Sequence, residues 1–194
     1  HKLPVKLPSI IPVKRTQGII EGIHLDIGHS DQHFTVKEMY DMIAGLDSDK
    51  KIKEDARGML DILLDAEAKV HDIPREEIHF HELSHIDTII DLLGVAKGMR
   101  YFDIDKVFCG PIPFGRGVVK TSHGVIPNPP PATLEILAGY NVYFLDELLE
   151  ITTPTGATIV KYYIDKQHKA PPFRIERIGY GAGSYTSARP DLLR

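Results

Sequence analysis

The sequence predicts an α+β fold, a mixed α/β arrangement with irregularly interleaved strands and helices around one sheet-containing core. Apolar residues alternate with period two over 19–27, as in a half-buried strand, whereas from Thr35 onward they recur at helical spacing. Strand-like and helix-like segments then follow one another without a regular alternation, which argues against a doubly wound parallel sheet. A hydrophobic content of 42% with 26% charged residues is that of a globular protein.

The periodicity places elements along the whole chain. Extended structure is expected over 3–27, with a turn at Gln17-Gly18. Helices are expected where apolar residues recur at helical spacing, namely 36–43, 51–70, 86–101, 132–138 and 154–166. Thr35 and Glu38 form a capping box in front of the first helix. Short strands are expected at 77–80, 106–109, 141–144 and 173–181, with a loop over 110–117.

Charge and cysteine content exclude several classes of protein. The net charge is −4 and no block of Lys and Arg stands out, which argues against a nucleic-acid partner. No apolar run approaches the roughly eighteen residues of a membrane span. Cys109 is the single cysteine, so internal disulfides are excluded and a reducing compartment, the cytoplasm, is expected. The chain opens at His1 without Met, and we expect a fragment or a trimmed chain.

Residues 78–91 gather three His, one Glu and two Asp between apolar runs. Imidazole and carboxylate ligands hold a divalent metal when several stand close together. In a strand, His79 and His81 would project to one face, and Asp87 and Asp91 lie one turn apart on the helix that follows. The stretch therefore predicts metal ligands at a strand-to-helix junction, which are His79, His81, Glu82, Asp87 and Asp91. A solvated helix face is the alternative for the two Asp residues.

A zinc hydrolase is a second interpretation of the same stretch. His81-Glu82-Leu83-Ser84-His85 fits the pattern H-E-x-x-H, in which two His on one helical face hold Zn²⁺ and the Glu polarises its water. That geometry requires the whole motif to be helical. A helix that begins near Ser84, with Ser84 as its N-cap, would leave His81 outside.

Two further segments contribute candidate ligands. Thr153-Pro154-Thr155-Gly156 has an N-cap Thr and Pro at the first helical position. The free N–H groups of such a helix start favour an anion, so Thr153, Thr155 and Gly156 are candidate phosphate contacts, with ordinary capping as the alternative. His123, in a loop beside Gly124, is a candidate further metal ligand or phosphate contact, with simple exposure as its alternative.

Four blocks, in order along the chain, resemble the LarC family, and the resemblance covers roughly residues 10–190. The first block comprises Glu67–His71, Pro74, Glu77–Glu82, Asp87 and Asp91. The second comprises Gly115, Gly117, Val118, His123-Gly124, Pro127, Pro129 and Pro131–Leu137. The third is Thr153–Ala157, and the fourth is Arg174–Gly183. Rare residue combinations in four ordered blocks are far more specific than one short H-E-x-x-H match.

The resemblance implies nickel insertion. LarC proteins place Ni²⁺ into a pyridinium bis(thiocarboxylic acid) mononucleotide, forming one carbon–nickel and two sulfur–nickel bonds, and so make the nickel-pincer cofactor of lactate racemase. The reaction depends on CTP with Mg²⁺ or Mn²⁺, and the resemblance implies a cytoplasmic metal-inserting lyase, or chelatase. Residues 1–183 would form its nickel-associated domain, with a small β-rich part at 1–30. Residues 184–194 would begin a linker to a missing C-terminal domain that uses CTP.

The sequence also departs from the family pattern. The Asp- and Gly-rich start with a Gly-Asp-Met element and the C-terminal portion are absent, so we expect a fragment that binds or presents nickel. The family usually has a small residue at position 85, which makes His85, and with it the H-E-x-x-H match, incidental. A non-catalytic nickel-binding or storage module and the zinc hydrolase stay open as alternatives, as does a homo-oligomer.

Overall fold

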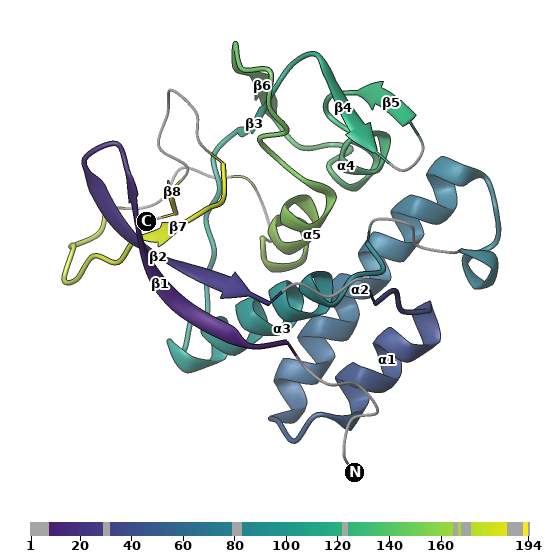
Figure 1. The fold of residues 1–194 in the computed structure, drawn as a ribbon, viewed down its shortest axis with the longest axis horizontal. Coiled ribbons are helices and arrows are strands. Elements are labelled where there is room, and N and C mark those ends of the chain that lie inside the picture. Colours follow the sequence, from purple (N-terminus) through teal and green to yellow (C-terminus); the bar gives the residue numbers. More distant parts are fainter. Residues whose placement is uncertain are drawn as a thin grey trace. The chain divides into compact units, whose positions relative to one another are not determined.

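The computed structural model describes residues 8–28, 32–78, 83–121, 124–164, 167, 172–185 and 192–193. Helices combine with strands in small sheets, so the expected α+β class is confirmed (Figure 1). The chain divides into two compact units. One contains residues 32–170, and the other contains residues 4–31 and 171–194.

The smaller unit is built on a four-stranded sheet with strand order β1-β2-β7-β8. Strands β1 (Ile10–Gln17) and β2 (Ile20–Ile27) form an antiparallel hairpin, and Gly18 takes the positive φ of its turn. The predicted turn at Gln17-Gly18 is thereby confirmed. Strand β7 (Gly181–Ala182) pairs parallel to β2, and β8 (Leu192–Leu193) pairs antiparallel to β7.

The strand predicted at 173–181 is wrong over most of its length. Residues 172–180 form no strand, and pairing begins only at Gly181. Phe173, Ile175 and Ile178 are exposed, at 76%, 65% and 64%. Alternating apolar residues favour a strand only where a neighbouring backbone completes the ladder, and these residues have no such partner within the described part of the unit.

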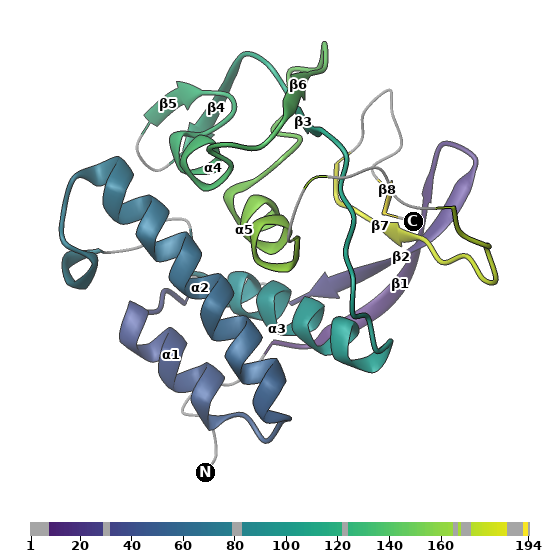
Figure 2. The ribbon, with the colours of Figure 1, turned by 180° about the vertical axis from the view of Figure 1, so that it is seen from behind.

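The larger unit is organised around helix α2 (Lys50–His71), which packs against the other four α-helices among its described residues (Figures 1 and 2). Those helices are α1 (Val36–Gly45), α3 (Ile86–Tyr101), α4 (Pro131–Ile136) and α5 (Pro154–Tyr163). The side chain of Asp49 caps α2, accepting from the N–H of Lys51 over 2.8 Å, and Asp72 ends it in the left-handed region. The capping box predicted for Thr35 and Glu38 is present at α1.

The core of this unit lies where α2 meets α4, α5 and a short sheet. Leu63, Phe114, Ile136 and Ala157 form its buried centre. Strands β3 (Ile112–Phe114) and β6 (Val142–Phe144) pair in parallel there, and β4 (Val118–Thr121) and β5 (Gly124–Pro127) form a separate hairpin. Helices α4 and α5 are therefore both folded against α2.

Several predicted boundaries in this unit need correction. The strand expected at 106–109 is absent except for an isolated bridge from Cys109 to Gln167. Strand β3 lies inside the expected loop 110–117, and β4 begins directly after it. Glu77 belongs to a short 3₁₀ turn, Arg75–Glu77, and not to a strand. Helix α5 ends at Tyr163, before the predicted Lys166. Runs of three or four residues carry too little periodicity to separate strand from loop.

Gly115 illustrates how tightly the β3 region is packed. A Cβ atom at this position would lie 1.8 Å from the carbonyl oxygen of Leu149. The side chain of Asn128 closes the same junction, because its Nδ2 donates to the carbonyls of Leu149 over 2.7 Å and of Arg116 over 3.1 Å. The loop that leads into α5 is thereby tied to the strand region.

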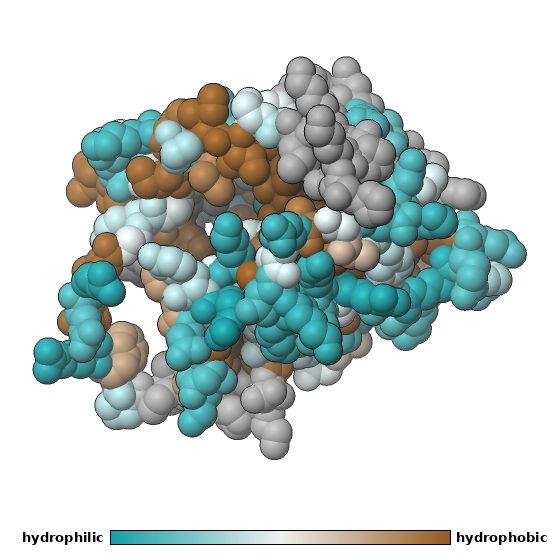
Figure 3. All heavy atoms as spheres, turned by 90° about the horizontal axis from the view of Figure 1, so that it is seen from below, coloured by the Kyte–Doolittle hydropathy of each residue, from teal (hydrophilic) through white to brown (hydrophobic). Residues whose placement is uncertain are grey.

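No helix among the described residues combines the length and apolar character needed to cross a membrane. Hydrophilic and apolar side chains lie in separate areas of the surface seen in Figure 3.

Candidate functional site

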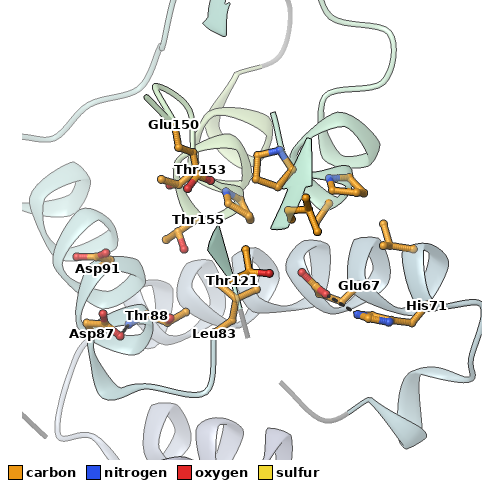
Figure 4. Close-up of a pocket in the computed structure, with 16 residues that line it drawn as sticks. Glu67, His71, Leu83, Asp87, Thr88, Asp91, Thr121, Glu150, Thr153 and Thr155 are labelled. Atoms are coloured by element: carbon orange, nitrogen blue, oxygen red, sulfur yellow. Dashed lines mark hydrogen bonds and ion pairs between the residues drawn. The ribbon is translucent and has the colours of Figure 1, made fainter. Parts of the chain in front are cut away.

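A cavity of about 520 Å³ lies within the larger unit. Its walls come from α2, from α3 and the residue segment before it, from the β4–β5 hairpin, and from the starts of α4 and α5 (Figure 4). The residues that line it are Glu67, Val70, His71, Leu83, Asp87, Thr88, Asp91, Thr121, Ile126, Pro130, Pro131, Ala132, Glu150, Thr153, Pro154 and Thr155.

Helix α3 brings two carboxylates to one wall of the cavity. Asp87 stands in the first helical turn, where the helix dipole favours a negative charge, and its Oδ1 accepts from the N–H of Thr88 over 2.8 Å. Asp91 follows one turn later on the same face. Solvent reaches Asp91 through the cavity, yet surrounding protein atoms desolvate it. This desolvation, together with the nearby Asp87 carboxylate, raises the pKa of Asp91 to about 6.

Helix α2 supplies a further carboxylate, that of Glu67, from another wall of the cavity. Glu67 and His71 stand one turn apart, and the Oε2 of Glu67 lies 3.5 Å from the Nε2 of His71. The Glu67 side chain is the more buried of the two, with 17% of its surface exposed against 37% for His71. Figure 4 shows this pair and the two α3 carboxylates on separate helices, with Glu150, Thr153 and Thr155 on a third segment.

The start of α5 forms part of the same lining. Thr153 is the N-cap, and its hydroxyl accepts from the N–H of Gly156 over 3.1 Å. Pro154 has no N–H, so the N–H of Thr155 is the first donor of this helix that its own cap does not use. Thr153 and Thr155 line the cavity, whereas the backbone N–H of Gly156 already donates to the side chain of the N-cap residue Thr153.

The segment before α3 is fixed by contacts with residues 33–34. Ser84 is 1% exposed, its hydroxyl lies 2.7 Å from Nδ1 of His33, and its carbonyl accepts from the N–H of Phe34 over 2.9 Å. The rings of His33 and His85 are in contact, with centroids 4.3 Å apart. These contacts hold Leu83 at the edge of the cavity.

The zinc-hydrolase interpretation does not survive this geometry. His85 is the N-cap of α3 with extended backbone angles, and residues 83–84 form a turn. The helical face that H-E-x-x-H requires is therefore not formed. The prediction that Ser84 caps α3 is also wrong, because the Ser84 hydroxyl pairs with His33 instead.

Arg75 fixes the chain on the other side of residues 79–82. Its guanidinium contacts the carboxylate of Asp61 on α2, lies 3.0 Å from Asp65 and donates to the hydroxyl of Tyr40 over 2.5 Å. Ile78, which follows the 3₁₀ turn, is 5% exposed. The chain is therefore anchored to α1 and α2 directly before His79.

The family model for nickel insertion proteins matches residues 2–194. The chain belongs to the nickel insertion protein family. The resemblance to LarC proteins is confirmed by this match and by relatives named as pyridinium-3,5-bisthiocarboxylic acid mononucleotide nickel insertion proteins.

Several curated relatives carry that name. The protein from Desulfitobacterium hafniense is 40% identical over 172 residues, which are 89% of this chain and 42% of the relative. That from Staphylococcus epidermidis is 36% identical over 198 residues, covering 100% and 49%, and that from Geobacillus kaustophilus is 38% identical over 179 residues, covering 92% and 43%. The chain thus spans about half the length of the curated relatives it matches. No solved structure matches it.

In this nickel insertion family member, the residues predicted as metal ligands or phosphate contacts divide into three groups. Asp87, Asp91, Thr153 and Thr155 line the cavity, whereas Gly156 is described but does not line it. The remaining predicted metal ligands, His79, His81, Glu82 and His123, lie outside the described residues. Among the residues that are described, no three His, Cys, Asp or Glu side chains come close enough to hold a metal ion by themselves.

The sequence did not single out Glu67, His71 and Glu150 as site residues. Glu67 and His71 carried a usable signal, because an acidic residue and a His one turn apart near the end of an amphipathic helix can act together. Glu150 stands alone in an irregular segment, and no local pattern marked it.

Proposed function

We propose that this chain takes up Ni²⁺ at the acidic cavity and presents it to a pyridinium-3,5-bisthiocarboxylic acid mononucleotide, the substrate named for the relatives. The carrying observation is that one cavity in a nickel insertion family member is lined by Asp87 and Asp91 from α3 and by Glu67 and His71 from α2. Two helices then converge on one space large enough for a small ligand.

The donor set of the cavity suits a metal that must be released again. Carboxylate oxygens and imidazole nitrogens bind Ni²⁺, but they are harder ligands than sulfur. A substrate that carries two thiocarboxylates offers softer donors and can draw nickel away from the protein. Cys109, the single thiol of the chain, does not line the cavity, so no protein thiolate of this chain would compete with the substrate there.

We assign the ligand set as the sequence predicts it. Asp87 and Asp91 provide two ligands, and His79, His81, Glu82 and His123 are proposed to complete the coordination. Arg75 and Ser84 support this assignment, because the described residues on both sides of 79–82 are anchored and Leu83 lies at the cavity. A short segment held at both ends is a suitable carrier for metal ligands.

The mononucleotide phosphate is proposed to lie at the start of α5. Thr155 offers a backbone N–H that the helix cap leaves available, and Thr153 and Thr155 both line the cavity. Gly156 supports the site indirectly, because its N–H holds the Thr153 side chain in place. The positive end of the helix dipole favours the phosphate there.

The rest of the reaction is proposed by analogy with the family. CTP with Mg²⁺ or Mn²⁺ would act in a C-terminal domain of the whole protein, and the reaction class would be that of a metal-inserting lyase, or chelatase, that serves lactate racemase maturation in the cytoplasm. A homo-oligomer is compatible with this assignment.

Metal content tests the proposal directly. Purified protein is incubated with equimolar Ni²⁺ and Zn²⁺, desalted and analysed by plasma mass spectrometry. We expect nickel to be retained by the wild type, and to be lost from the Asp87→Asn, Asp91→Asn double variant and from His79→Ala. Asp105→Asn removes an exposed carboxylate that does not line the cavity and serves as the matched control. Equal nickel content in all four proteins would overturn the ligand assignment. In a second step the pyridinium mononucleotide is added to the nickel-loaded wild type. Nickel that stays bound to the protein after this addition would favour a storage module.

A further inference from the structure

The sheet of the smaller unit gathers apolar side chains on one of its faces. Residues opposite each other on paired strands share a face, and so do residues two apart on one strand. Leu25 on β2 is opposite Pro12 on β1, and Ile23 on β2 is beside Gly181 on β7. Gly181 is opposite Leu193 on β8, and a Cβ atom at Gly181 would lie 3.7 Å from the Cβ of Leu193. This apolar face crosses all four strands (Figure 1) and comprises Ile10, Pro12, Ile23, Leu25 and Leu193.

The apolar face is open to solvent along its whole length. Leu193 is 79% exposed, and Ile10, Ile23 and Leu25 are each close to half exposed. Large aliphatic side chains stabilise a fold when they are removed from water, so these residues contribute little of that stabilisation in the chain as it stands.

The opposite face of the same sheet is packed near the hairpin turn. A Cβ atom at Gly22 would lie 3.1 Å from the Cβ of Ala182, and the buried Gln17 amide donates to the carbonyl of Tyr185 over 2.9 Å. Among the residues of this unit that the structure describes, Ala182 is nevertheless the single buried apolar side chain. A sheet needs a second layer against which it buries a face, and the described part of this unit contains no such layer.

The segment that leads into β7 lacks a partner as well. Phe173, Ile175 and Ile178 are apolar and exposed, and residues 172–180 pair with no other strand that the structure describes. The ladder begins only where the N–H of Ile23 donates to the carbonyl of Tyr180 over 2.9 Å. A backbone without a ladder partner can accept a further strand.

We propose that, in the full-length protein, polypeptide outside residues 1–194 covers the apolar face and supplies a partner strand for residues 172–180. The relative from Staphylococcus epidermidis matches the whole of this chain with only 49% of its own length, so it has about as much polypeptide again outside the matched region. Strand β8 belongs to this sheet, so a continuation beyond it leaves the fold beside the apolar face. The proposal is independent of the nickel and nucleotide assignments.

A covalently attached segment fits the apolar face better than a second copy of the chain. A stable interface between separate proteins buries roughly 800 Å² on each partner, whereas this face presents five apolar side chains. Attachment supplies an effective concentration in the mM range, so a smaller contact suffices. Lys14 and Glu21, the charged residues that the four described strands place on this side, pair with each other over 2.7 Å. The surface of the covering segment is therefore expected to be apolar.

Photo-crosslinking of the full-length protein identifies what covers the face. Benzoylphenylalanine is placed at position 25, in the middle of the apolar face, and in a second protein at position 19, in the hairpin turn, where the Ile side chain is fully exposed. After irradiation and digestion, we expect position 25 to be joined to peptides outside residues 1–194, and position 19 to give no such product. Joining of position 25 to residues 1–194 of a second copy, or to no peptide at all, overturns the proposal.

Thermal denaturation of Ile23→Thr compares the full-length protein with the chain of residues 1–194. Thr keeps the β-branched shape and removes apolar surface. The melting temperature should fall by at least about 2 °C in the full-length protein and stay nearly unchanged in the chain, where Ile23 is exposed. Ile19→Thr is the matched control and should change neither protein. An equal fall in both proteins from Ile23→Thr overturns the proposal, because the face would then be covered without the additional polypeptide.

Amide hydrogen exchange tests the added strand separately. Residues 172–180 should exchange at least about tenfold more slowly in the full-length protein than in the chain of residues 1–194, because a ladder partner protects their N–H groups. Equal exchange rates in the two proteins overturn the assignment of a partner strand to this segment.

Discussion

The hydroxyl of Tyr162, on α5, donates a hydrogen bond of 2.9 Å to the carboxylate of Asp55, on α2. Tyr163 donates to the other oxygen of the same carboxylate over 3.3 Å, and Lys51 forms an ion pair with it over 2.7 Å. Asp55 is 5% exposed, so these partners compensate the burial of its charge. Because α2 and α5 both line the cavity, this carboxylate helps to fix the spacing of two of its walls.

Replacement of Tyr162 by Phe removes this bond without changing the packing of the ring. We expect the free energy of unfolding to fall by about 1–2 kcal/mol, because the lost bond is to a charged group. Urea denaturation followed by circular dichroism measures the change. Tyr163→Phe is the matched comparison and should cost less, because its contact is longer. A larger loss from Tyr163→Phe would show that the packing of α5 does not depend on Tyr162.

Alkaline pH should weaken the same contact. Burial and the hydrogen bond to Asp55 raise the pKa of Tyr162 from 10.0 to about 12. The folded state then holds the phenolic proton more tightly than the unfolded state, so this stabilisation is complete below about pH 10 and is lost as the pH rises toward 12. Unfolding midpoints measured from about pH 9 to 11.5 should decline less steeply in Tyr162→Phe than in the wild type. Identical slopes would contradict the raised pKa.

Asp91 should cost stability at neutral pH, because its folded-state pKa of about 6 lies above the ordinary 3.8. The folded protein binds the proton more tightly, so stability falls as the pH rises from about 4 to 6 and the full penalty is present above that range. Asp91→Asn should therefore raise the melting temperature of the metal-free protein at about pH 7.5 and leave it nearly unchanged at about pH 4. Each kcal/mol gained corresponds to about 2–4 °C in a chain of this size. No gain at the higher pH would contradict this expectation.

Arg75 should be needed to hold the segment that leads into His79. Arg75→Ala removes the guanidinium that contacts both Asp61 and Tyr40 and leaves only the hydrogen bond from Tyr40 to Asp61, and we expect a loss of about 2–3 kcal/mol in the free energy of unfolding. Amide hydrogen exchange in Arg75→Ala should be faster than in the wild type only within residues 72–78. Arg100→Ala removes an exposed ion pair with Asp49 at 3.4 Å and should cost no more than about 0.5 kcal/mol. A similar loss from both variants would argue against an anchoring role.

Two glycine substitutions should act in opposite directions. Gly115→Ala would place a Cβ atom 1.8 Å from the Leu149 carbonyl, so the backbone must shift, and we expect a loss of at least about 3 kcal/mol. A Cβ atom at Gly94, inside α3, would meet no other atom within 4 Å, and Gly94→Ala should stabilise the protein by about 0.5–1 kcal/mol. Thermal denaturation of the two variants side by side provides the measurement. Equal effects would contradict the packing at Gly115.

Helix α3 and strand β7 illustrate what local pattern can and cannot predict. The bounds of α3, Ile86–Tyr101, agree with the prediction residue for residue, because a helix satisfies its backbone hydrogen bonds within its own segment. The strand expected at 173–181 fails because a strand needs a partner from elsewhere in the chain, and in the structure that partner is available only from Gly181. The β4–β5 hairpin was missed because each of its strands has only four residues, too few to show a clear period.

The sequence by itself determined the α+β class, the helix bounds around the acidic residues, and the family, which it carried in ordered blocks of residues. It also placed Asp87 and Asp91 on one helical face, because a spacing of four residues is a local property. Only the tertiary structure decided that Glu67, His71 and Glu150 share a cavity with them, and that His85 lies outside the helix it would need for a zinc site. Convergence of this kind depends on how helices pack across long separations in the chain, which no local spacing encodes.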